Sequence, residues 1–334
     1  MGDPGGIGPE VALRACCDSR VRAACAPVVV GSAALLERTA CDLGLEARFD
    51  RPWSESPETW RVALSRQCEY FLAIDTGGAA HERHLGRPSK EGGLAAVSAI
   101  RQAVELSLEQ YLDGIVTAPV SKQSLAAAGY GIVGHTEILA KITRAKSFAM
   151  MMKRGDLRVV LATTHLALAE VSRAITAGGL LEKISLANRY LLRFGVAKRP
   201  RIAVCALNPH AGEGGLLGIE ERTKIAPAVR KARRLGMIVE GPLAADSVFR
   251  EQAAKNFDAI VAMYHDQGII PIKMGGMDAA VNVTLGLPVL RTSPAHGTAF
   301  DIAGTGSASA EGMVTAVLEC AWMARAVGRR VGGD

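Results

Sequence analysis

Short apolar runs alternate with longer amphipathic runs along almost all of the 334 residues, and this alternation limits the fold more than any other feature. The short runs are rich in valine, isoleucine and alanine without strict polar alternation, which is typical of strands covered on both faces. We expect strands at Pro27–Gly31, Phe71–Asp75, Gly114–Ala118, Arg158–Thr163, Ile202–Leu207, Met237–Glu240, Asp258–Tyr264, Ala280–Leu285 and Val289–Arg291. Strands and helices in alternation predict an α/β fold around largely parallel sheets.

The longer runs place apolar residues at three- and four-residue steps, as helices packed on a sheet do. They predict helices over residues 94–111, 220–235 and 308–327. After the strand that ends at Tyr264, three polar residues and a glycine predict a turn that runs on to Lys273. The length allows two domains of ordinary size or one large one.

Composition narrows the class of protein. Hydrophobic residues make up 49% and charged residues 22%, as in a soluble globular protein, and no apolar run reaches the roughly 20 residues of a membrane helix. The seven cysteines form no CxxC pair, which favours reduced thiols in the cytoplasm. The net charge of +6 is spread along the chain, so we expect solvated helix faces and no nucleic-acid partner, with a field that attracts an anionic substrate.

Three of the expected strands lead directly to a histidine. LRVVLATTH ends at His165, RIAVCALNPH at His210 and FDAIVAMYH at His265. Ligands bind at the carboxyl ends of strands in open α/β sheets, so the three imidazoles can converge within one sheet or across a dimer. Three neutral imidazoles suit zinc, with cobalt, nickel or manganese as alternatives. The competing interpretation is that each histidine is only hydrogen-bonded in its loop.

Other residues favour an anion. His135 and Thr136 open an apolar helical stretch, and a helix N-terminus offers free N–H groups, although Thr136 and Glu137 can equally be capping residues. Three further residues that can bind an anion lie within 19 positions of one another, near expected strand ends: Lys273, Asn282 and Arg291. Two cations and an amide suit a phosphate or carboxylate, and ordinary surface charge is the alternative.

Two loops of small residues complete the set. GDPGGIGPE at 2–10 feeds a helix and can cradle an anion, although it is not a GxGxxG fingerprint after a strand. HGTAFDIAG at 296–304 lets backbone approach a ligand closely, because little side chain is in the way.

These residues resemble the 4-hydroxythreonine-4-phosphate dehydrogenase family of vitamin B6 (pyridoxine) biosynthesis and its paralogues. Blocks that match in order over nearly the whole chain are GDPGGIGPE (2–10), VTAPVSK (116–122), GHTE (134–137), ATTH (162–165), LNPHAGEGG (207–215), GPLAAD (241–246), MYHDQG (263–268), VNVTLGLP (281–288), RTS (291–293) and HGTAFDIAGTG (296–306). The segment IIPIK at 269–273 looks more like the corresponding segment of the paralogues that oxidise 4-phospho-threonate or 4-phospho-erythronate.

The resemblance implies two α/β/α domains like those of the isocitrate and isopropylmalate dehydrogenases, with the active site in the interdomain cleft. It implies an NAD-side domain of residues 1–124 and 284–334, and a metal, substrate and dimerisation domain of residues 125–283. It also implies a homodimer with a shared active site, NAD as cofactor, and a divalent metal that is zinc, or else cobalt, nickel, manganese or magnesium.

Site residues are carried over from the family onto matching positions. They are His165, His210 and His265 for the metal, His135, Thr136, Lys273, Asn282 and Arg291 for the substrate, and His296, Gly297, Thr298 and Asp301 for NAD. The implied reaction is oxidation and decarboxylation of a phosphorylated 3-hydroxy acid. Asp246 and Asp266 are candidates for the proton acceptor, and Asp246 can instead support a ligand histidine.

The sequence departs from the family in two places. The chain starts on the GDP loop where family members have an apolar strand, so we expect an exposed edge on the first sheet. Ala295 stands where an aspartate usually precedes the HGTA histidine, which leaves the substrate and the cofactor pose open. Alternatives are a dihydrodiol dicarboxylate dehydrogenase, a three-histidine zinc hydrolase, and a non-catalytic anion-binding relative.

Overall fold

The chain forms two units, each built on its own strands. The computed structural model describes residues 1–45, 48–50, 70–76, 84–131, 134–250, 254–276 and 278–331. The first unit comprises Met1–Ala145 and Pro288–Ala324, and the second comprises Lys146–Leu287 and Arg325–Asp334. Residues 125–145 therefore fall in the first unit. The predicted α/β class is confirmed, while the assignment of roles to the two domains stays a prediction.

The first unit contains a small parallel sheet and, in addition, a parallel pair of strands. The sheet has the order β1-β3-β2, from β1 (Val28–Gly31), β3 (Tyr70–Asp75) and β2 (Arg48–Asp50). The pair is β4 (Ile115–Val116) with β11 (Arg291–Pro294). β11 begins at the last residue of the predicted strand Val289–Arg291, because the chain approaches it from Pro288, which has no N–H to donate to a ladder.

Helices cover these strands. Their bounds are α1 (Gly8–Cys17), α2 (Ser19–Ala24), α3 (Ala33–Asp42), α5 (Lys90–Leu108), α6 (Lys122–Ala127), α7 (His135–Thr143), the short η4 (Phe300–Ile302) and α14 (Glu311–Val331). Ser89 fixes the start of α5, because its hydroxyl accepts a hydrogen bond from the N–H of Gly92 at 2.9 Å. Val11 of α1 and Val314 of α14 belong to one buried apolar cluster.

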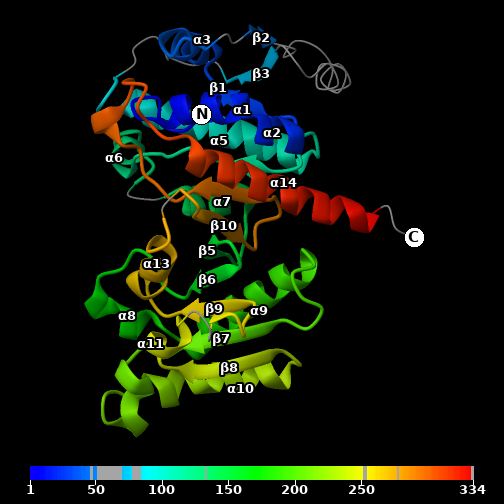
Figure 1. Cartoon of the computed structure of the whole chain (residues 1–334). Helices are drawn as coiled ribbons and strands as arrows, with labels where there is room; N and C mark the ends of the chain where they lie inside the picture. The colour runs from blue at the N-terminus through cyan, green and yellow to red at the C-terminus, as the bar shows by residue number, and fades with distance from the viewer. Residues whose placement is uncertain are drawn as a thin grey trace. The chain divides into compact units, whose positions relative to one another are not determined.

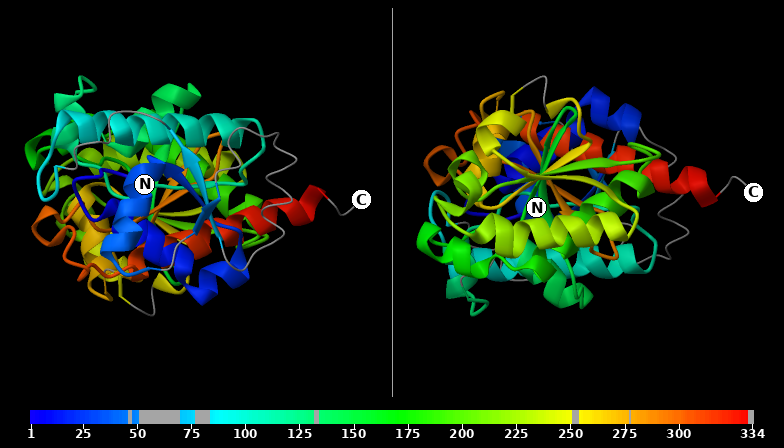
Figure 2. Two further views of the ribbon diagram at one scale, coloured as in Figure 1. Left: turned by 90° about the horizontal axis from the view of Figure 1, so that it is seen from above. Right: turned by 90° about the horizontal axis from the view of Figure 1, so that it is seen from below.

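The part of a sheet that lies in the second unit has six strands, one of which runs against the others. Its order is β10-β5-β6-β9-β7-β8, from β10 (Val281–Leu285), β5 (Ala149–Arg154), β6 (Leu157–Leu161), β9 (Ala259–Ala262), β7 (Arg201–Cys205) and β8 (Ile238–Leu243). β5 is antiparallel to both of its neighbours, and the ladders from β6 to β8 are parallel. Seen from below, these strands fan out, as those of a twisted sheet do (Figure 2).

Helices follow the strands of this unit. Their bounds are α8 (Leu168–Ala174), α9 (Ala177–Arg193), η2 (Pro209–Gly215), η3 (Glu221–Ile225), α10 (Ala226–Arg234), α11 (Ala245–Val248) and α13 (His265–Lys273). The predicted helix over 220–235 is η3, one π-helical turn, continued by α10. Among the described helices none is long and apolar enough to cross a membrane.

Two elements of the second unit differ from the prediction. β5 was not expected, although Gly155 and Asp156 form the two-residue connection of a hairpin between β5 and β6. The predicted turn at 264–273 is wrong, because these residues form α13 despite Pro271 inside it. The buried face of α13 explains the difference: Ile269 and Ile272 pack inward at a three-residue spacing.

The described cysteines are free thiols, and Cys68 lies outside the described residues. Cys16, Cys205 and Cys320 are buried, and burial raises the pKa of each of these thiols to about 12. A thiol with so high a pKa holds almost no thiolate at neutral pH and is therefore unreactive.

Candidate active site

The carboxyl ends of β6, β9, β7 and β8 lie at one edge of the second unit's sheet, because these strands are parallel. The helices that follow three of them, α8, α13 and α11, lie together along the left-hand side of this sheet in Figure 1. All three histidines predicted to bind metal belong to this unit and follow strands of this set.

The structure brings His165 and His265 together. Their ring centroids are 5.7 Å apart and the ring planes differ by 39°. The register explains the encounter: Leu161 of β6 pairs with Ala262 of β9, and the histidines follow these residues by four and three positions. Oδ1 of Asp266 lies 2.7 Å from Nδ1 of His265, so that nitrogen carries the proton and Nε2 is left to bind a ligand.

His210 occupies a loop of unusual backbone. Residues 210–214 all have positive φ, between 44° and 79°, and three of them are not glycine. Among residues of the described part of the chain, no three or more His, Cys, Asp or Glu side chains are placed to hold one metal ion. The structure therefore brings two of the predicted ligands together and leaves His210 apart from them.

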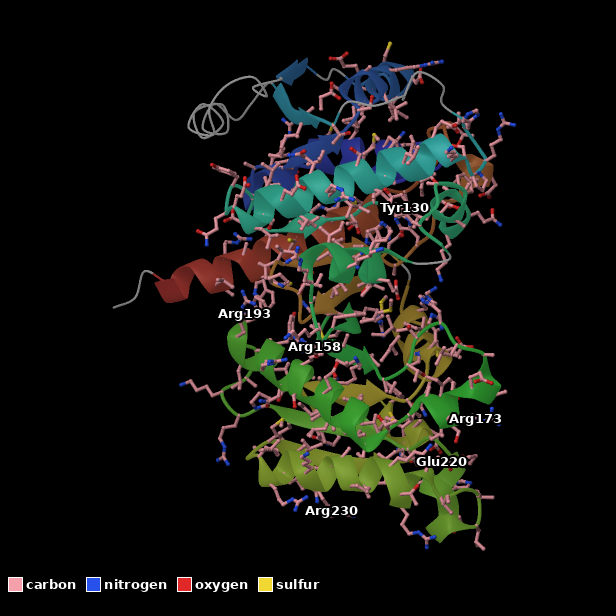
Figure 3. The ribbon with its side chains drawn as sticks, turned by 180° about the vertical axis from the view of Figure 1, so that it is seen from behind. Tyr130, Arg158, Arg173, Arg193, Glu220 and Arg230 are labelled. Carbon is pink, nitrogen blue, oxygen red and sulfur yellow. The ribbon has the colours of Figure 1, made fainter. Side chains whose placement is uncertain are left out.

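A carboxylate network holds the base of the His210 loop. Oε1 of Glu221 accepts hydrogen bonds from the backbone N–H groups of Leu207 and Asn208, each at 2.8 Å. Glu220, labelled in Figure 3, accepts from the Asn208 amide at 2.9 Å and from the Ser172 hydroxyl at 2.5 Å. The Ser172 and Asn208 hydrogen bonds lower the pKa of the Glu220 carboxyl to about 2. Both carboxylates are thus structural partners of the loop.

The two imidazoles at this edge are donors of the kind that a divalent transition metal takes. Zinc–nitrogen bonds are about 2.0–2.1 Å long, so both rings can reach one ion from their 5.7 Å separation. A carboxylate on the far nitrogen of a ligand histidine is the usual arrangement at such sites, and Asp266 supplies it. Asp246, on the short α11, is exposed at the end of the neighbouring strand β8.

A buried cation lies in the first unit. Arg291 is 1% exposed at the start of β11, and its Nη2 donates a hydrogen bond to the hydroxyl of Thr117 at 2.6 Å. Burial lowers its pKa to about 10, with Glu137 acting in the opposite direction. Arg291 is therefore charged at neutral pH. Glu137 also accepts from the N–H of Gly134 at 3.0 Å, which confirms a capping role at the start of α7.

His135, the first residue of α7, lies near this cation as a neutral imidazole. Burial, and then the charge of Arg291, lower its pKa from 6.5 to about 3. The ring hydrogen-bonds to the backbone of Ala118, while the buried Nε2 has no hydrogen-bond partner among the described residues. The carbonyl bond places the proton on Nδ1, so Nε2 offers a lone pair to a ligand hydroxyl or N–H. A cation and an acceptor suit a phosphorylated or carboxylated polar ligand.

This burial predicts how stability depends on pH. The unfolded histidine takes up a proton below about pH 6.5, whereas folded His135 resists it down to about pH 3, so the free energy of unfolding falls as the pH falls through this window. The loss approaches about 1.4 kcal/mol per pH unit and reaches about 2 kcal/mol from pH 6.5 to about pH 4.5. We expect His135→Gln to flatten this part of the profile in urea unfolding. Thr136→Val, a buried non-titrating neighbour, should keep the wild-type slope, and an equally steep slope in His135→Gln would contradict the prediction.

The remaining predicted substrate residues belong to the second unit. Lys273 is exposed at the last position of α13. Asn282 lies on β10, opposite Met152 of β5, and its Oδ1 is buried without a hydrogen-bond partner among the described residues. A buried amide oxygen of this kind is a candidate for a ligand contact.

The loop predicted to bind NAD lies beside the glycine-rich loop of residues 2–10 in the first unit. The N–H of Ile7 donates to the carbonyl of Thr298 at 2.9 Å, and a side chain at Gly6 would collide with the same carbonyl. At Gly297 a side-chain carbon would meet nothing within 4 Å, so backbone there is open to a ligand. Asp301 is exposed, and the buried Nε2 of His296 has no partner among the described residues.

Several known proteins are similar to this chain over nearly its whole length. The family model described as pyridoxal phosphate biosynthetic protein PdxA matches residues 23–320. A 4-hydroxythreonine-4-phosphate dehydrogenase of Geobacter metallireducens is 44% identical over 98% of this chain and 95% of that protein. A D-threonate 4-phosphate dehydrogenase of Cupriavidus necator is 42% identical over 97% and 96%. The solved 4-hydroxythreonine-4-phosphate dehydrogenase of Burkholderia phymatum superposes with a TM-score of 0.82 at 41% identity, over 97% and 96%.

These likenesses define an oxidoreductase, a dehydrogenase that acts on a CH–OH group. The chain belongs to the pyridoxal phosphate biosynthetic protein PdxA family. The family resemblance inferred from the sequence blocks is thereby confirmed.

Proposed function

We propose that the protein is an NAD-dependent, divalent-metal-assisted dehydrogenase that oxidises and decarboxylates a phosphorylated 3-hydroxy acid. Its candidate substrates are 4-hydroxythreonine 4-phosphate and the 4-phosphates of threonate and erythronate, in keeping with the names of the relatives. The observation that carries the proposal is the imidazole pair, His165 and His265, with Asp266 on the far nitrogen of His265.

His165 and His265 would hold the metal, with His210 as the third ligand. Zinc suits these neutral nitrogen donors best, and cobalt, nickel, manganese or magnesium are alternatives. When bound, such an ion acidifies a substrate hydroxyl and stabilises negative charge on the substrate oxygen. Asp266 keeps the proton of His265 on Nδ1, so that the lone pair of Nε2 points away from the carboxylate. Asp246 is retained as a candidate proton acceptor, because it is exposed on α11.

The substrate's anionic group would be held by Arg291, with Lys273 and Asn282 in the same role. Arg291 is charged and shielded from water, which strengthens its attraction for a phosphate. His135 is neutral, so its Nε2 accepts a proton-bearing group of the substrate and adds no charge. Thr136, buried next to it on α7, completes the substrate set.

NAD would lie along the loop of residues 296–301, which contributes His296, Gly297, Thr298 and Asp301. The open backbone at Gly297 allows a close approach, and the exposed Asp301 carboxylate can accept hydrogen bonds from ribose hydroxyls. When bound, the nicotinamide accepts the hydride. Ala295 puts a methyl group where the family usually has a carboxylate, so the nearest acidic side chain for the cofactor in this loop is Asp301.

A homodimer with a shared site would bring His210 to a metal held by the other chain. Exposed apolar side chains surround the loops after β6 and β7 and support this arrangement: Leu166, Leu168, Leu216, Leu217 and Ile219. Leu216 is 84% exposed, and a patch of this kind marks a protein–protein contact. The free, unreactive thiols fit a cytoplasmic location.

Formation of NADH by the full chain tests the proposal. The panel is 4-hydroxythreonine 4-phosphate, threonate 4-phosphate, erythronate 4-phosphate and an aromatic dihydrodiol dicarboxylate, each with and without a chelator. We expect turnover of at least one 4-phosphate, release of CO₂, and loss of activity with the chelator. Turnover of the dihydrodiol alone would mean that the substrate carries a carboxylate in place of the phosphate. Hydrolysis without NAD, or tight binding without turnover, would overturn the dehydrogenase proposal.

A further inference from the structure

The amide of Gln267 joins the ends of two histidine-bearing strands. Gln267 lies in the first turn of α13, two residues after His265. Its Oε1 accepts a hydrogen bond from the backbone N–H of Met263 at 2.6 Å, just past β9. Its Nε2 donates to the backbone carbonyl of Ala206 at 2.8 Å, just past β7. One side chain therefore contacts the backbone that leads to His265 and the backbone that leads to the His210 loop.

The hydrogen bonds of Gln267 lie just beyond the last paired residues of β7 and β9. β7 and β9 pair through Val204 opposite Val261, and the chains then separate toward their loops. Two residues further on, the amide of Gln267 spans the gap between Ala206 and Met263. The N–H of Met263 needs an acceptor and the carbonyl of Ala206 needs a donor, so the two partners fix the orientation of the amide.

A second side chain, that of Thr163, links the end of β6 to Met263. The hydroxyl of Thr163, two residues before His165, donates to the carbonyl of Met263 at 2.7 Å. Met263 is fully buried, and side chains hold both its N–H and its carbonyl. These backbone groups would otherwise be buried without the strand partner that satisfies them elsewhere in the sheet.

We propose that Gln267 and Thr163 are positioning residues that hold in place the strand ends from which His165, His210 and His265 follow, and through them the affinity for a divalent metal. The inference rests on the proposed metal role of His165, His210 and His265. Each bridging side chain is two residues from its histidine in sequence, so a small shift of the bridge moves the imidazole directly. Metal ligands tolerate little displacement, because the bond lengths are fixed to within a few tenths of an ångström.

Isosteric variants separate hydrogen bonding from packing. Gln267→Met keeps the volume and removes both hydrogen bonds, and Gln267→Glu keeps the acceptor for Met263 and removes the donor to Ala206. Thr163→Val removes the hydroxyl, and Thr163→Ser keeps it. We expect Co²⁺ to bind about 10–100-fold more weakly to the first three full-length variants, by calorimetry and by the visible absorption of the bound ion. Thr163→Ser should bind Co²⁺ almost as the wild type does.

The same two strands provide a matched control at their opposite ends. Oδ2 of Asp258, at the start of β9, accepts a hydrogen bond from the backbone N–H of Arg201 of β7 at 2.7 Å. Asp258→Asn weakens this bridge far along the strands from the histidines. We expect a lower melting temperature with unchanged Co²⁺ affinity, whereas the Gln267 variants should lose affinity out of proportion to any change in melting temperature.

The outcomes distinguish this inference from the proposed function. If wild-type Co²⁺ binding is lost in His265→Ala but kept in Gln267→Met and Thr163→Val, the positioning role is wrong and the metal site stands. If the wild type does not bind Co²⁺, or His265→Ala binds it equally well, both fall. If Gln267→Met does not fold, the comparison of Thr163→Val with Thr163→Ser decides, and equal affinities for those two would overturn the inference.

Discussion

Replacement of His265 by alanine is expected to abolish divalent-metal binding and to lower kcat by about a thousandfold or more. A catalytic metal contributes several kcal/mol of transition-state stabilisation, and about 1.4 kcal/mol is a factor of ten in rate. His265 is one of the two imidazoles that the structure brings together, and Asp266 directs its Nε2 outward. The side chain is 38% exposed, so its removal should leave the fold intact. Metal content and NADH formation of the purified chain measure both effects.

Two further variants calibrate this result. Asp266→Asn keeps the shape and weakens the hold on His265, so we expect metal affinity to fall by about 10–100-fold, short of complete loss. His84→Ala removes a histidine of the first unit that contacts Glu91 at 3.6 Å, and it should behave as the wild type does. Full activity together with a normal metal content in His265→Ala would refute the site.

A mixture of variants tests whether the site is shared. His210 lies apart from the imidazole pair within one chain, so in a homodimer it can serve the metal held by the other chain. His210→Ala and His265→Ala should each be inactive. Mixed after subunit exchange, they should regain part of the wild-type activity, because half of the sites in a mixed dimer carry both native residues. A mixture that forms mixed dimers and stays inactive would place all three ligands on one chain.

Replacement of Arg291 by methionine is expected to have the second large effect. We expect KM for the phosphorylated substrate to rise by a factor of about 10²–10³. Truncation of one partner in a buried, hydrogen-bonded charge pair costs about 3–4 kcal/mol, and every 1.4 kcal/mol is tenfold in affinity. Stability should change little, because methionine fills a similar volume and, with Glu137 exposed, the substitution leaves no charge buried without a partner. The variant therefore separates a cation retained for binding from one retained for the fold.

Smaller changes around Arg291 sharpen the test. Arg291→Lys keeps a charge and loses the planar fork, so its KM should lie between those of the wild type and Arg291→Met. Thr117→Val removes the hydroxyl that accepts from Nη2 and should raise KM about fivefold, in line with about 1 kcal/mol for one hydrogen bond. Steady-state kinetics and thermal melts are read together. An unchanged KM with a large fall in melting temperature in Arg291→Met would show that the cation is structural.

The sequence predicted most of the parallel strands and the placing of histidines at their ends, because apolar runs and their terminal polar residues are local signals. It did not predict that α13 begins at His265, since that helix depends on the burial of Ile269 and Ile272 against the sheet. The turn of the β5–β6 hairpin, Gly155–Asp156, was a usable signal that was not taken into account.

Partners distant in the chain could not be predicted. Thr117 and Arg291 are 174 positions apart, and nothing local in the segment VTAPVSK indicates that its threonine meets a guanidinium. Gln267 had no assigned role for the same reason, because its contact with Ala206 depends on the neighbouring position of β7 and β9. Strand order, which fixes such meetings, is a property of the whole sheet.

The left-handed run at 210–214 limits how this protein can change by mutation. His210, Ala211 and Glu213 each adopt a backbone region that costs an L-residue about 1–2 kcal/mol, and the hydrogen bonds accepted by Glu221 help to offset that cost. Loss of the Glu221 carboxylate would let the loop relax to right-handed backbone and carry His210 away. A substitution at residue 221 would therefore also affect the role proposed for His210, although the two side chains have different roles.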